Sequence, residues 1–436
     1  GDWIAFFDVD PADRADPASG SVTADRDEFI GRNGSLRRPA ALRRTGLSGR
    51  TGAALDPCAA IQVVVELAPG QSREIVFRLG MGRSADEAGE LVQRHRGAGA
   101  ARATLTAVHA HWRHALGAVQ VTTPDPALNL LANGWLIYQT IACRMWARSG
   151  YYQSGGAYGF RDQLQDAMAL VHTRPRLLRD QLLLCAGRQF REGDVQHWWH
   201  PPAGRGVRTH ISDDYLWLPL ALARYVRSTN DTGVLGEAVG FLDGPAVSAH
   251  EESWYDMPGR AAETAPLYEH ARRAVQHGLR FGAHGLPLIG AGDWNDGMNR
   301  VGSQGRGESV WLGFFLCEVL REFAPLARRQ GDVAFAQRCD DERAGLAQRL
   351  ERSGWDGGWY RRAYFDDGTP LGSAENAECR IDAVAQSWAV LSGVGSDERA
   401  RRAMDAVATH LVRDDAGLVQ LLDPPFDRRG PNPGYI

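Results

Sequence analysis

The chain has 436 residues, of which 44% are hydrophobic and 23% charged, the balance of a globular protein with two or three domains. The formal net charge is −4, and no basic stripe is interleaved with aromatic residues, so we expect no nucleic-acid partner. No apolar run approaches the roughly 20 residues of a membrane span and no signal peptide opens the chain, so we expect a cytoplasmic location without membrane contact by the chain itself.

Residues 1–82 are predicted to be β-structure. The run 59–67 is rich in β-branched residues, Pro69-Gly70 makes a turn, and 74–79 alternates in part between apolar and polar residues. This spacing predicts a β-hairpin at the edge of a sandwich. The Gly-, Asp- and Arg-rich stretch 8–50 is predicted to be mostly loop.

The pattern becomes helical after Gly82. Ser84 precedes a helix start with acidic residues in the first turn, and we place a helical linker at 83–122. The domain at 123–436 is predicted to be mainly α, a helical bundle or a helical toroid with no strands between its helices. Its ten helices are predicted at 126–148, 162–173, 176–191, 213–228, 231–242, 262–280, 308–329, 331–352, 376–393 and 396–413.

The six cysteines do not indicate a functional site, whereas the surroundings of the thirteen tryptophans favour a sugar site. The cysteines lie at positions 58, 143, 185, 317, 339 and 379 without CxxC or metal-ligand spacing, so we interpret them as buried or idle thiols. Many tryptophans stand next to carboxylates, Gly and His, which is typical of sugar sites, where flat apolar faces meet hydroxyl-binding carboxylates. The count alone favours a sugar site only weakly.

The first candidate segment is 155–166, where glycines precede Arg161 and Asp162 at a helix start. The pair could be a structural cap and surface ion pair, or a fork of donors and acceptors for sugar hydroxyls. Tyr158 and Phe160 alongside favour the second interpretation.

The second segment, 192–202, places two histidines around Trp198 and Trp199. His197 and His200 are three residues apart, but Gly193 and Pro201-Pro202 argue against a helix, and no third zinc ligand is evident. An aromatic platform for sugar is the favoured interpretation, with a packed structural loop as the alternative.

The third segment contains Ser212, Asp213 and Asp214. Ser212 is a plausible N-cap with both acids in the first helical turn, which would explain them structurally. The equal alternative is that one acid reaches into a cleft.

The fourth segment, 290–300, is the most specific because Asp293 and Asp296 bracket Trp294 within a Gly-rich loop. A calcium loop would need a different spacing and a later bidentate Glu. A carboxyl group beside an indole is partly desolvated, which raises its pKa, and a general acid needs that property near pH 7. Two weaker loops add Glu308 and Gln386 as candidate substrate-binding residues, and Asp213 and Asp293 are further candidates. We expect no metal, phosphate loop or nucleophile elbow.

At these motifs the chain resembles glycoside hydrolase family 94, the cellobiose and chitobiose phosphorylases. The stretches SGGAYGFRDQLQD, EGDVQHWWHPPAGRGVRTHISDDYLWLP and GAGDWNDGMNRVG look most like the branch of cyclic β-1,2-glucan synthases and β-1,2-oligoglucan phosphorylases. The resemblance implies the tail of a β-sandwich at 1–82, a helical linker and an (α/α)6 toroid. It implies that Asp296 is the general acid, that Arg161 and Asp162 hold the glucosyl unit, and that Trp294 lines its subsite.

The implied reaction is inverting phosphorolysis of a β-glucosidic bond. Asp296 would protonate the glycosidic oxygen and inorganic phosphate, the co-substrate, would attack the anomeric carbon to give α-glucose 1-phosphate without any further cofactor. The partners would be phosphate and a β-linked gluco-oligosaccharide. A homodimer is one option for the assembly, and the synthase branch suggests a parent protein at the inner membrane with this region on its cytoplasmic side.

Two departures from the family pattern bear on these expectations. The family's phosphate-binding His and Thr-Gly loop follow the position of 433–436, so we expect an incomplete toroid here. Gly155 and Gly156 stand where some disaccharide phosphorylases place an Arg, which suggests a different linkage such as β-1,2. The rival functions are an inverting hydrolase, with Asp213, Asp214 or Glu308 as its base, and a glucan-binding or chain-length-measuring module without turnover.

Overall fold

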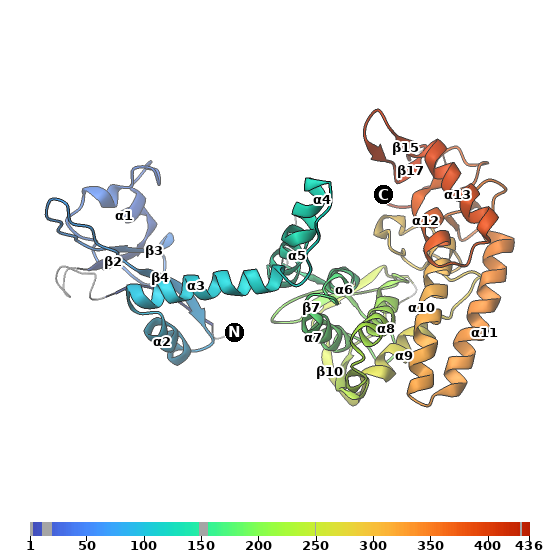
Figure 1. Ribbon diagram of the computed structural model, residues 1–436, viewed down its shortest axis with the longest axis horizontal. Coiled ribbons are helices and arrows are strands. Elements are labelled where there is room, and N and C mark those ends of the chain that lie inside the picture. Colours follow the sequence, from blue (N-terminus) through green and yellow to red (C-terminus); the bar gives the residue numbers. More distant parts are fainter. Residues whose placement is uncertain (1–2, 11–19, 148–155, 249, 428–429) are drawn as a thin grey trace. The chain divides into compact units, whose positions relative to one another are not determined.

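The computed structural model describes residues 3–10, 20–147, 156–248, 250–427 and 430–436. The chain divides into two compact units, Gly1–Ala115 and Leu116–Ile436. Both units are drawn in Figure 1.

The first unit contains two antiparallel strand pairs. β1 (Ile4–Val9) pairs with β4 (Phe77–Gly82), and β2 (Ser21–Asp25) pairs with β3 (Pro57–Gln62). The predicted hairpin is therefore wrong, because β3 and β4 each pair with a strand from the first 25 residues and not with each other. The stretch 8–50 also contains more structure than expected, since β2 lies within it.

Helices of different lengths complete the first unit. They are α1 (Arg26–Ile30), the 3-10 helix η2 (Ala40–Arg43), α2 (Ala85–Arg94) and α3 (Gly97–Leu116). The predicted helix start at Ser84 is confirmed, because its side chain accepts a hydrogen bond of 3.2 Å from the backbone N–H of Glu87.

The second unit is mainly helical. A first helical run consists of α4 (Pro126–Leu130), η3 (Leu131–Trp135), α5 (Leu136–Gln139) and η4 (Thr140–Trp146). The longer helices that follow are α6 (Phe160–Ala169), α7 (Pro175–Ala186), α8 (Trp217–Thr229), α9 (Leu267–Gly278), α10 (Val310–Arg329), α11 (Val333–Arg349), α12 (Ala383–Leu391) and α13 (Asp397–His410). Short helical turns are η5 (Asp214–Leu216), η6 (Gly233–Gly236), η7 (Asp296–Met298) and η8 (Leu350–Gly354).

Helix α10 is at the centre of this packing. Most of its residues are buried, and it contacts α8, α11 and α12, as Figure 1 shows for the neighbouring green and orange helices. Its apolar run from Val310 to Cys317 explains this position, because a helix that is apolar on nearly all sides must be covered on all sides. None of the helices in the described part of the chain is both long and apolar enough to cross a membrane.

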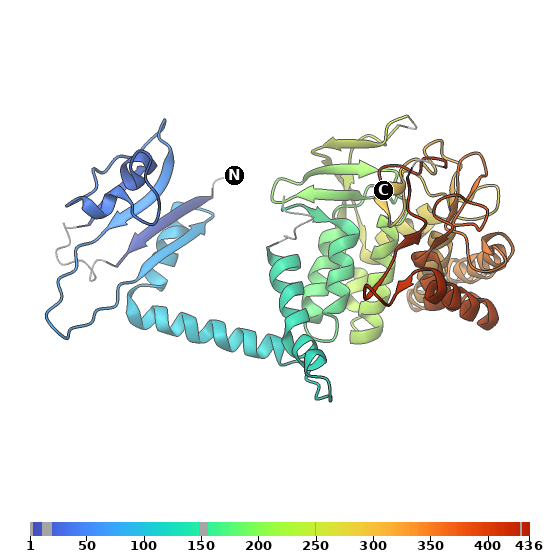
Figure 2. The ribbon, with the colours of Figure 1, turned by 90° about the horizontal axis from the view of Figure 1, so that it is seen from above.

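Strands between the helices are the main difference from the prediction. The largest sheet has the order β5 (Tyr158–Gly159), β6 (Gln196–His200), β7 (Arg205–Thr209) and β9 (Ser253–Asp256), all antiparallel. Figure 2 shows these strands, in green, at one end of the adjacent helices. The expectation of a strand-free domain is therefore wrong.

A second antiparallel pair replaces a predicted helix. β8 (Ala238–Asp243) pairs with β10 (Gly259–Pro266), so the helix expected at 231–242 does not exist and the one expected at 262–280 begins only at Leu267. A small three-stranded sheet is formed by β11 (Glu308–Ser309), β12 (Ala363–Tyr364) and β13 (Pro370–Leu371). Two short pairs join β14 (Ile381–Asp382) to β17 (Leu422–Asp423) and β15 (Val412–Arg413) to β16 (Leu418–Val419). The helix expected at 376–393 accordingly starts only at Ala383, after β14.

Candidate active site

The loop that carries Asp296 is shaped by glycine. Gly290 has a φ of 61° and Gly292 a φ of 127°, and a Cβ on Gly290 would lie 2.1 Å from the backbone oxygen of His210. The Asn295 side chain then accepts a hydrogen bond of 3.0 Å from the N–H of Gly297 and caps η7. These constraints place Asp296 at the first position of that short helix.

Asp296 is partly accessible, with a side chain 35% exposed, and both of its oxygens face cations. Arg161 donates a hydrogen bond from Nη2 to Oδ1. His197 places its Nε2 3.6 Å from Oδ2. The carboxyl group therefore lies between a guanidinium and an imidazole that come from α6 and β6.

Arg161 is fixed from behind. Its Nη1 donates 2.9 Å hydrogen bonds to Oδ1 of Asp213 and to the backbone oxygen of Asp293. Asp213 is buried and also accepts 3.0 Å from Nε1 of Trp217, and burial raises its pKa although Arg161 opposes this. Arg161 is therefore not part of a surface ion pair. Its side chain is fixed by Asp213, by the backbone oxygen of Asp293 and by Asp296.

His197 is held by Asp214 in the same way. Its Nδ1 lies 2.8 Å from Oδ2 of Asp214, a buried carboxylate. Burial opposes the charged imidazolium, but Asp214 and Asp296 outweigh it and raise the pKa of His197 to about 10. Of the two interpretations of this segment, side-chain capping is wrong, because Asp213 stands at the N-cap of η5 without a side-chain cap bond and the Ser212 hydroxyl donates to the Gly292 oxygen at 3.1 Å.

The expected upward pKa shift of Asp296 is also wrong. Burial does raise the pKa, but the contact with His197 and the charges of Arg161 and His197 outweigh burial, so the pKa of Asp296 is lowered. The indole of Trp294 cannot produce the expected effect because its ring is 43% exposed and its Nε1 is directed to Oε1 of Gln165, at 3.4 Å.

Asp293 supports the loop from inside. Its oxygens accept two 2.6 Å hydrogen bonds from Arg362 and one of 2.7 Å from the Ser309 hydroxyl. Burial raises its pKa, but the Arg362 charge and hydrogen bonds outweigh it and lower the pKa. Because Asp293 is completely buried, its expected role as a sugar ligand is not supported.

Three further expected sugar ligands are buried in the same way. Trp199 has no exposed surface and stacks on Tyr158 at 5.6 Å. Glu308 accepts hydrogen bonds from the backbone N–H groups of residues 284 and 286, and Gln386 bonds the backbone of residue 360. These side chains hold loops in place and have little or no surface to offer a substrate.

Trp198 and Asp162 remain available. Trp198 is half-buried, with its ring 5.5 Å from that of Tyr255 and 5.2 Å from that of His200. Asp162 is 37% exposed, beside Arg161. Since 196–200 form a strand and not a helix, the spacing of His197 and His200 does not create a helical metal site, and the described residues contain no cluster of metal-ligating side chains.

A small aromatic cavity of about 240 Å³ lies beside Trp294. It is lined by Gln165, Trp217, Trp294, Trp311, Ala383, Val384, Ser387 and Trp388. It is smaller than the roughly 300–1,000 Å³ that drug-sized ligands occupy, and its walls suit the apolar face of one sugar ring.

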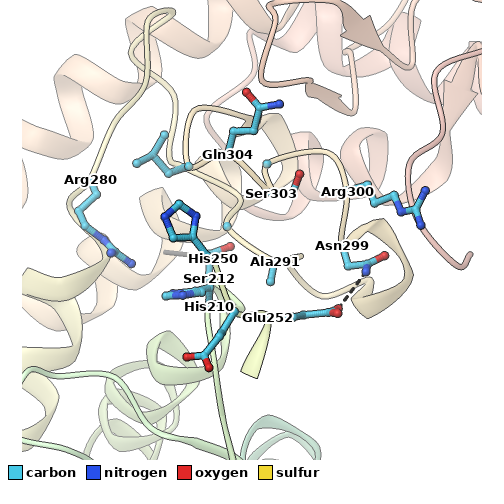
Figure 3. A pocket seen from close by; sticks show the side chains of 15 residues that line it. His210, Ser212, His250, Glu252, Arg280, Ala291, Asn299, Arg300, Ser303 and Gln304 are labelled. Atoms are coloured by element: carbon cyan, nitrogen blue, oxygen red, sulfur yellow. Dashed lines mark hydrogen bonds between the residues drawn. The ribbon is translucent and has the colours of Figure 1, made fainter. Parts of the chain in front are cut away.

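A larger cavity of about 630 Å³ borders the same loop, shown in Figure 3. Most of the residues that line it have polar side chains, among them His210, Glu252, Arg280 and Asn299, and Asn299 donates a 2.9 Å hydrogen bond to Glu252. Such walls suit a ligand rich in hydroxyl groups.

The residues 433–436 pack against the loop that carries Asp296, which the sequence did not suggest. Arg300 donates 3.0 Å from its backbone to the oxygen of Pro433, and the N–H of Ile436 donates 3.1 Å to the oxygen of Gly297. Burial and the charges of Asp296 and Glu252 raise the pKa of Tyr435. Tyr435 therefore belongs to the surroundings of Asp296.

Comparison with known families decides the membership of the chain. Residues 111–436 match the model of the glycosyl hydrolase 94 superfamily catalytic domain, and residues 1–98 match the glycosyl hydrolase 94 supersandwich domain. The chain belongs to glycosyl hydrolase family 94. The resemblance seen in the sequence motifs is confirmed, as is the order of a β-domain before a helical domain.

Curated relatives within family 94 include a synthase and phosphorylases. The chain is 47% identical over 416 residues to the cyclic β-(1,2)-glucan synthase NdvB of Rhizobium meliloti (strain 1021), covering 95% of this chain and 15% of the synthase. It is 29% identical to the 3-O-β-D-glucopyranosyl-β-D-glucuronide phosphorylase of Paenibacillus borealis and 27% identical to the N,N'-diacetylchitobiose phosphorylase of Vibrio proteolyticus, covering 94% and 90% of this chain. It spans 50% of each phosphorylase.

Sequence reasoning missed several residues of this family 94 site. Trp217 could have been found, because it follows Asp213 by four residues and therefore shares its helical face. The sequence offers Asp214 as a cap, a cleft residue or a hydrolase base and His197 as a doubtful zinc ligand, but it does not indicate that the two contact each other. Arg362 itself carries no sequence signal.

Proposed function

We propose that this site performs inverting phosphorolysis of β-glucosidic bonds, with Asp296 as the general acid. The observation that carries the proposal is the position of Asp296, a partly exposed carboxyl group whose two oxygens face Arg161 and His197. Phosphate is the nucleophile and co-substrate, and α-glucose 1-phosphate is the product. The phosphorylases among the family 94 relatives support this reaction type.

The state of the neighbouring carboxylates favours phosphorolysis over hydrolysis. An inverting hydrolase needs a second carboxylate that activates water on the opposite face of the sugar. The three residues considered for that task, Asp213, Asp214 and Glu308, are buried and accept hydrogen bonds from protein groups. Phosphate carries its own negative charge and needs no such base.

We place the glucosyl unit at the aromatic cavity beside Trp294, with Asp162 and Gln165 as partners for its hydroxyl groups. Both lie on α6 next to Arg161, and the cavity size supports a single ring. Further sugar units would occupy the larger polar cavity on the same loop. Arg161 would act on the substrate through Asp296, because protein groups already hold it.

The linkage proposed is β-1,2, supported by the identity with a cyclic β-(1,2)-glucan synthase. We also propose that the helices of residues 123–436 belong to an (α/α)6 toroid, preceded by a linker at 83–122 and the tail of a β-sandwich at 1–82. A cytoplasmic setting follows from the use of phosphate and is proposed on that ground.

The test is incubation with β-1,2-, β-1,3- and β-1,4-linked gluco-oligosaccharides, each with and without phosphate. We expect glucose 1-phosphate from the β-1,2 series only, and only with phosphate. Release of free glucose without phosphate would contradict phosphorolysis, and a preference for another series would contradict the linkage.

A further inference from the structure

In the site without substrate, Asp296 lacks the proton that a general acid must donate. A family 94 phosphorylase as proposed needs a protonated Asp296 when the glycosidic bond breaks. Its pKa is lowered by His197 and Arg161, so without substrate it is ionised at neutral pH. A proton must therefore reach Asp296 after the sugar binds.

The geometry limits which oxygen can receive that proton. Oδ1 of Asp296 accepts the hydrogen bond from Arg161, whose other donors are fixed on Asp213 and the Asp293 backbone. Oδ1 is therefore occupied by a donor. Oδ2 is the oxygen that can carry a proton, and His197 Nε2 lies 3.6 Å from it.

His197 is placed to hold a proton on each ring nitrogen. Nδ1 lies 2.8 Å from Oδ2 of Asp214, and this carboxylate can keep the Nδ1 proton on the ring throughout turnover. Nε2 faces Asp296. Asp214 has a second oxygen, Oδ1, 3.8 Å from Nη1 of Arg161 and buried without a hydrogen-bond partner. Two further groups lie near the His197–Asp296 pair: Arg161 on α6, which bonds Asp296, and Tyr435, which the Asp296 charge reaches. Asp213, before η5, acts on the pair only through Arg161.

We propose that Asp214, His197 and Asp296 form a proton relay, in which the His197 imidazolium passes its Nε2 proton to Oδ2 of Asp296 when a sugar covers the site. This inference rests on the proposed function and makes His197 a positioning residue that acts through Asp296. Covering the carboxylate removes its water, which favours the uncharged imidazole and carboxylic acid over the ion pair. The 3.6 Å separation shortens in the complex, as acid–base contacts commonly do.

The proton balance of the turnover is complete. Oδ2 of Asp296 gives its proton to the glycosidic oxygen, the bond between C1 and that oxygen breaks, and the leaving sugar departs as an alcohol. An oxygen of hydrogen phosphate forms the new bond to C1. The proton that hydrogen phosphate loses returns through solvent to Nε2 of His197, while Asp214 holds Nδ1–H throughout.

The charge state of His197 can be measured without any turnover. In protein labelled with ¹³C at histidine Cε1, the signal missing from His197→Gln belongs to His197. We expect this signal to remain at its protonated position up to at least about pH 8, and Asp214→Asn to lower its titration by more than about one pH unit. A His197 that titrates near its ordinary value of about 6.5, or one that Asp214→Asn leaves unchanged, would overturn the relay.

Kinetics then test the proton supply itself. We expect His197→Gln to lower kcat for phosphorolysis at pH 7 at least about tenfold, with KM changed less than about threefold. Its kcat should rise as pH falls, because Asp296 must take its proton from solvent, whereas the wild type changes little. The matched control His410→Gln, at an exposed histidine on α13, should behave as the wild type.

Failure of the proposed function and failure of the relay give different results. A wild type that makes no glucose 1-phosphate from any oligosaccharide contradicts the proposed function, while the NMR titration still decides the charge state of His197. A His197→Gln variant with the kcat and pH profile of the wild type overturns the relay alone. If His197→Gln does not fold, His197→Asn takes its place in the NMR assignment and Asp214→Asn takes its place in the kinetics, with the same expectations.

Discussion

Arg362 donates two parallel hydrogen bonds of 2.6 Å to the two carboxylate oxygens of Asp293, and both side chains are almost completely buried. Asp293 in turn offers its backbone oxygen to Arg161, which bonds Asp296. A chain of four residues thus links the protein interior to the proposed general acid. The position of Asp296 depends on a pair that no substrate touches.

Removing one partner of the buried Arg362–Asp293 pair should lower the stability of the protein strongly. Arg362→Met leaves the Asp293 carboxylate buried without its cation, and we expect the free energy of unfolding to fall by about 3–5 kcal/mol. Urea denaturation measures it. The control Arg191→Met breaks the exposed pair with Asp243 and should cost less than about 1 kcal/mol. Equal losses in the two variants would contradict the structural role of Arg362.

Acid should destabilise the protein through His277. Burial and the charge of Arg280 lower the pKa of His277 to about 4 in the folded state, against about 6.5 unfolded. The unfolded chain therefore takes up the proton first, and the contribution of His277 to stability is present above pH 6.5 and lost as pH falls towards 4. Denaturation of the wild type and His277→Gln at pH 7 and pH 5 measures this: the loss on acidification should be smaller in the variant. An identical loss would contradict the assignment.

Trp294 should contribute to sugar affinity and not to stability. Its ring is 43% exposed and lines the aromatic cavity, so Trp294→Ala should weaken binding of a β-1,2-gluco-oligosaccharide about tenfold, or about 1.4 kcal/mol, with little change in the unfolding midpoint. Calorimetric titration gives the affinity. Trp135→Ala removes an indole of similar exposure outside that cavity and should bind as the wild type does. Unchanged affinity in Trp294→Ala would place the sugar elsewhere.

The sequence predicted the motifs of the site better than the contacts within it. The glycine-rich and aromatic surroundings of Arg161 and Asp296 are local signals, and the fold brings these two side chains into contact. Their roles, and that of Trp294, stay predictions. The pKa direction of Asp296 was wrong because His197 and Arg161, which lower it, come from positions 99 and 135 residues earlier in the chain. Such long-range pairing leaves no trace in local spacing.

For the fold too, the elements with a local signal are predicted well and those that depend on long-range pairing are not. Long apolar helices such as α10 follow from their own composition, so the prediction at 308–329 is close to the observed Val310–Arg329. The sequence predicts a helix over 231–242, but residues 238–243 form strand β8, which pairs with β10. Because no tight turn joins the two strands, the local sequence gives no hairpin signal. The same reason explains the false hairpin in the first unit, where both strands found partners in residues 4–25.

The role of Asp296 as general acid is tested most directly by comparing two leaving groups in Asp296→Asn. With a β-1,2-gluco-oligosaccharide and phosphate, we predict that kcat falls by about 10²- to 10⁴-fold, because the leaving sugar needs a proton. With 2,4-dinitrophenyl β-glucoside, whose leaving group departs without one, the loss should be less than about tenfold. The control Asp180→Asn, at an exposed position on α7, should match the wild type on both. Undiminished oligosaccharide phosphorolysis by Asp296→Asn, or equal losses on both substrates, would contradict general-acid catalysis by Asp296.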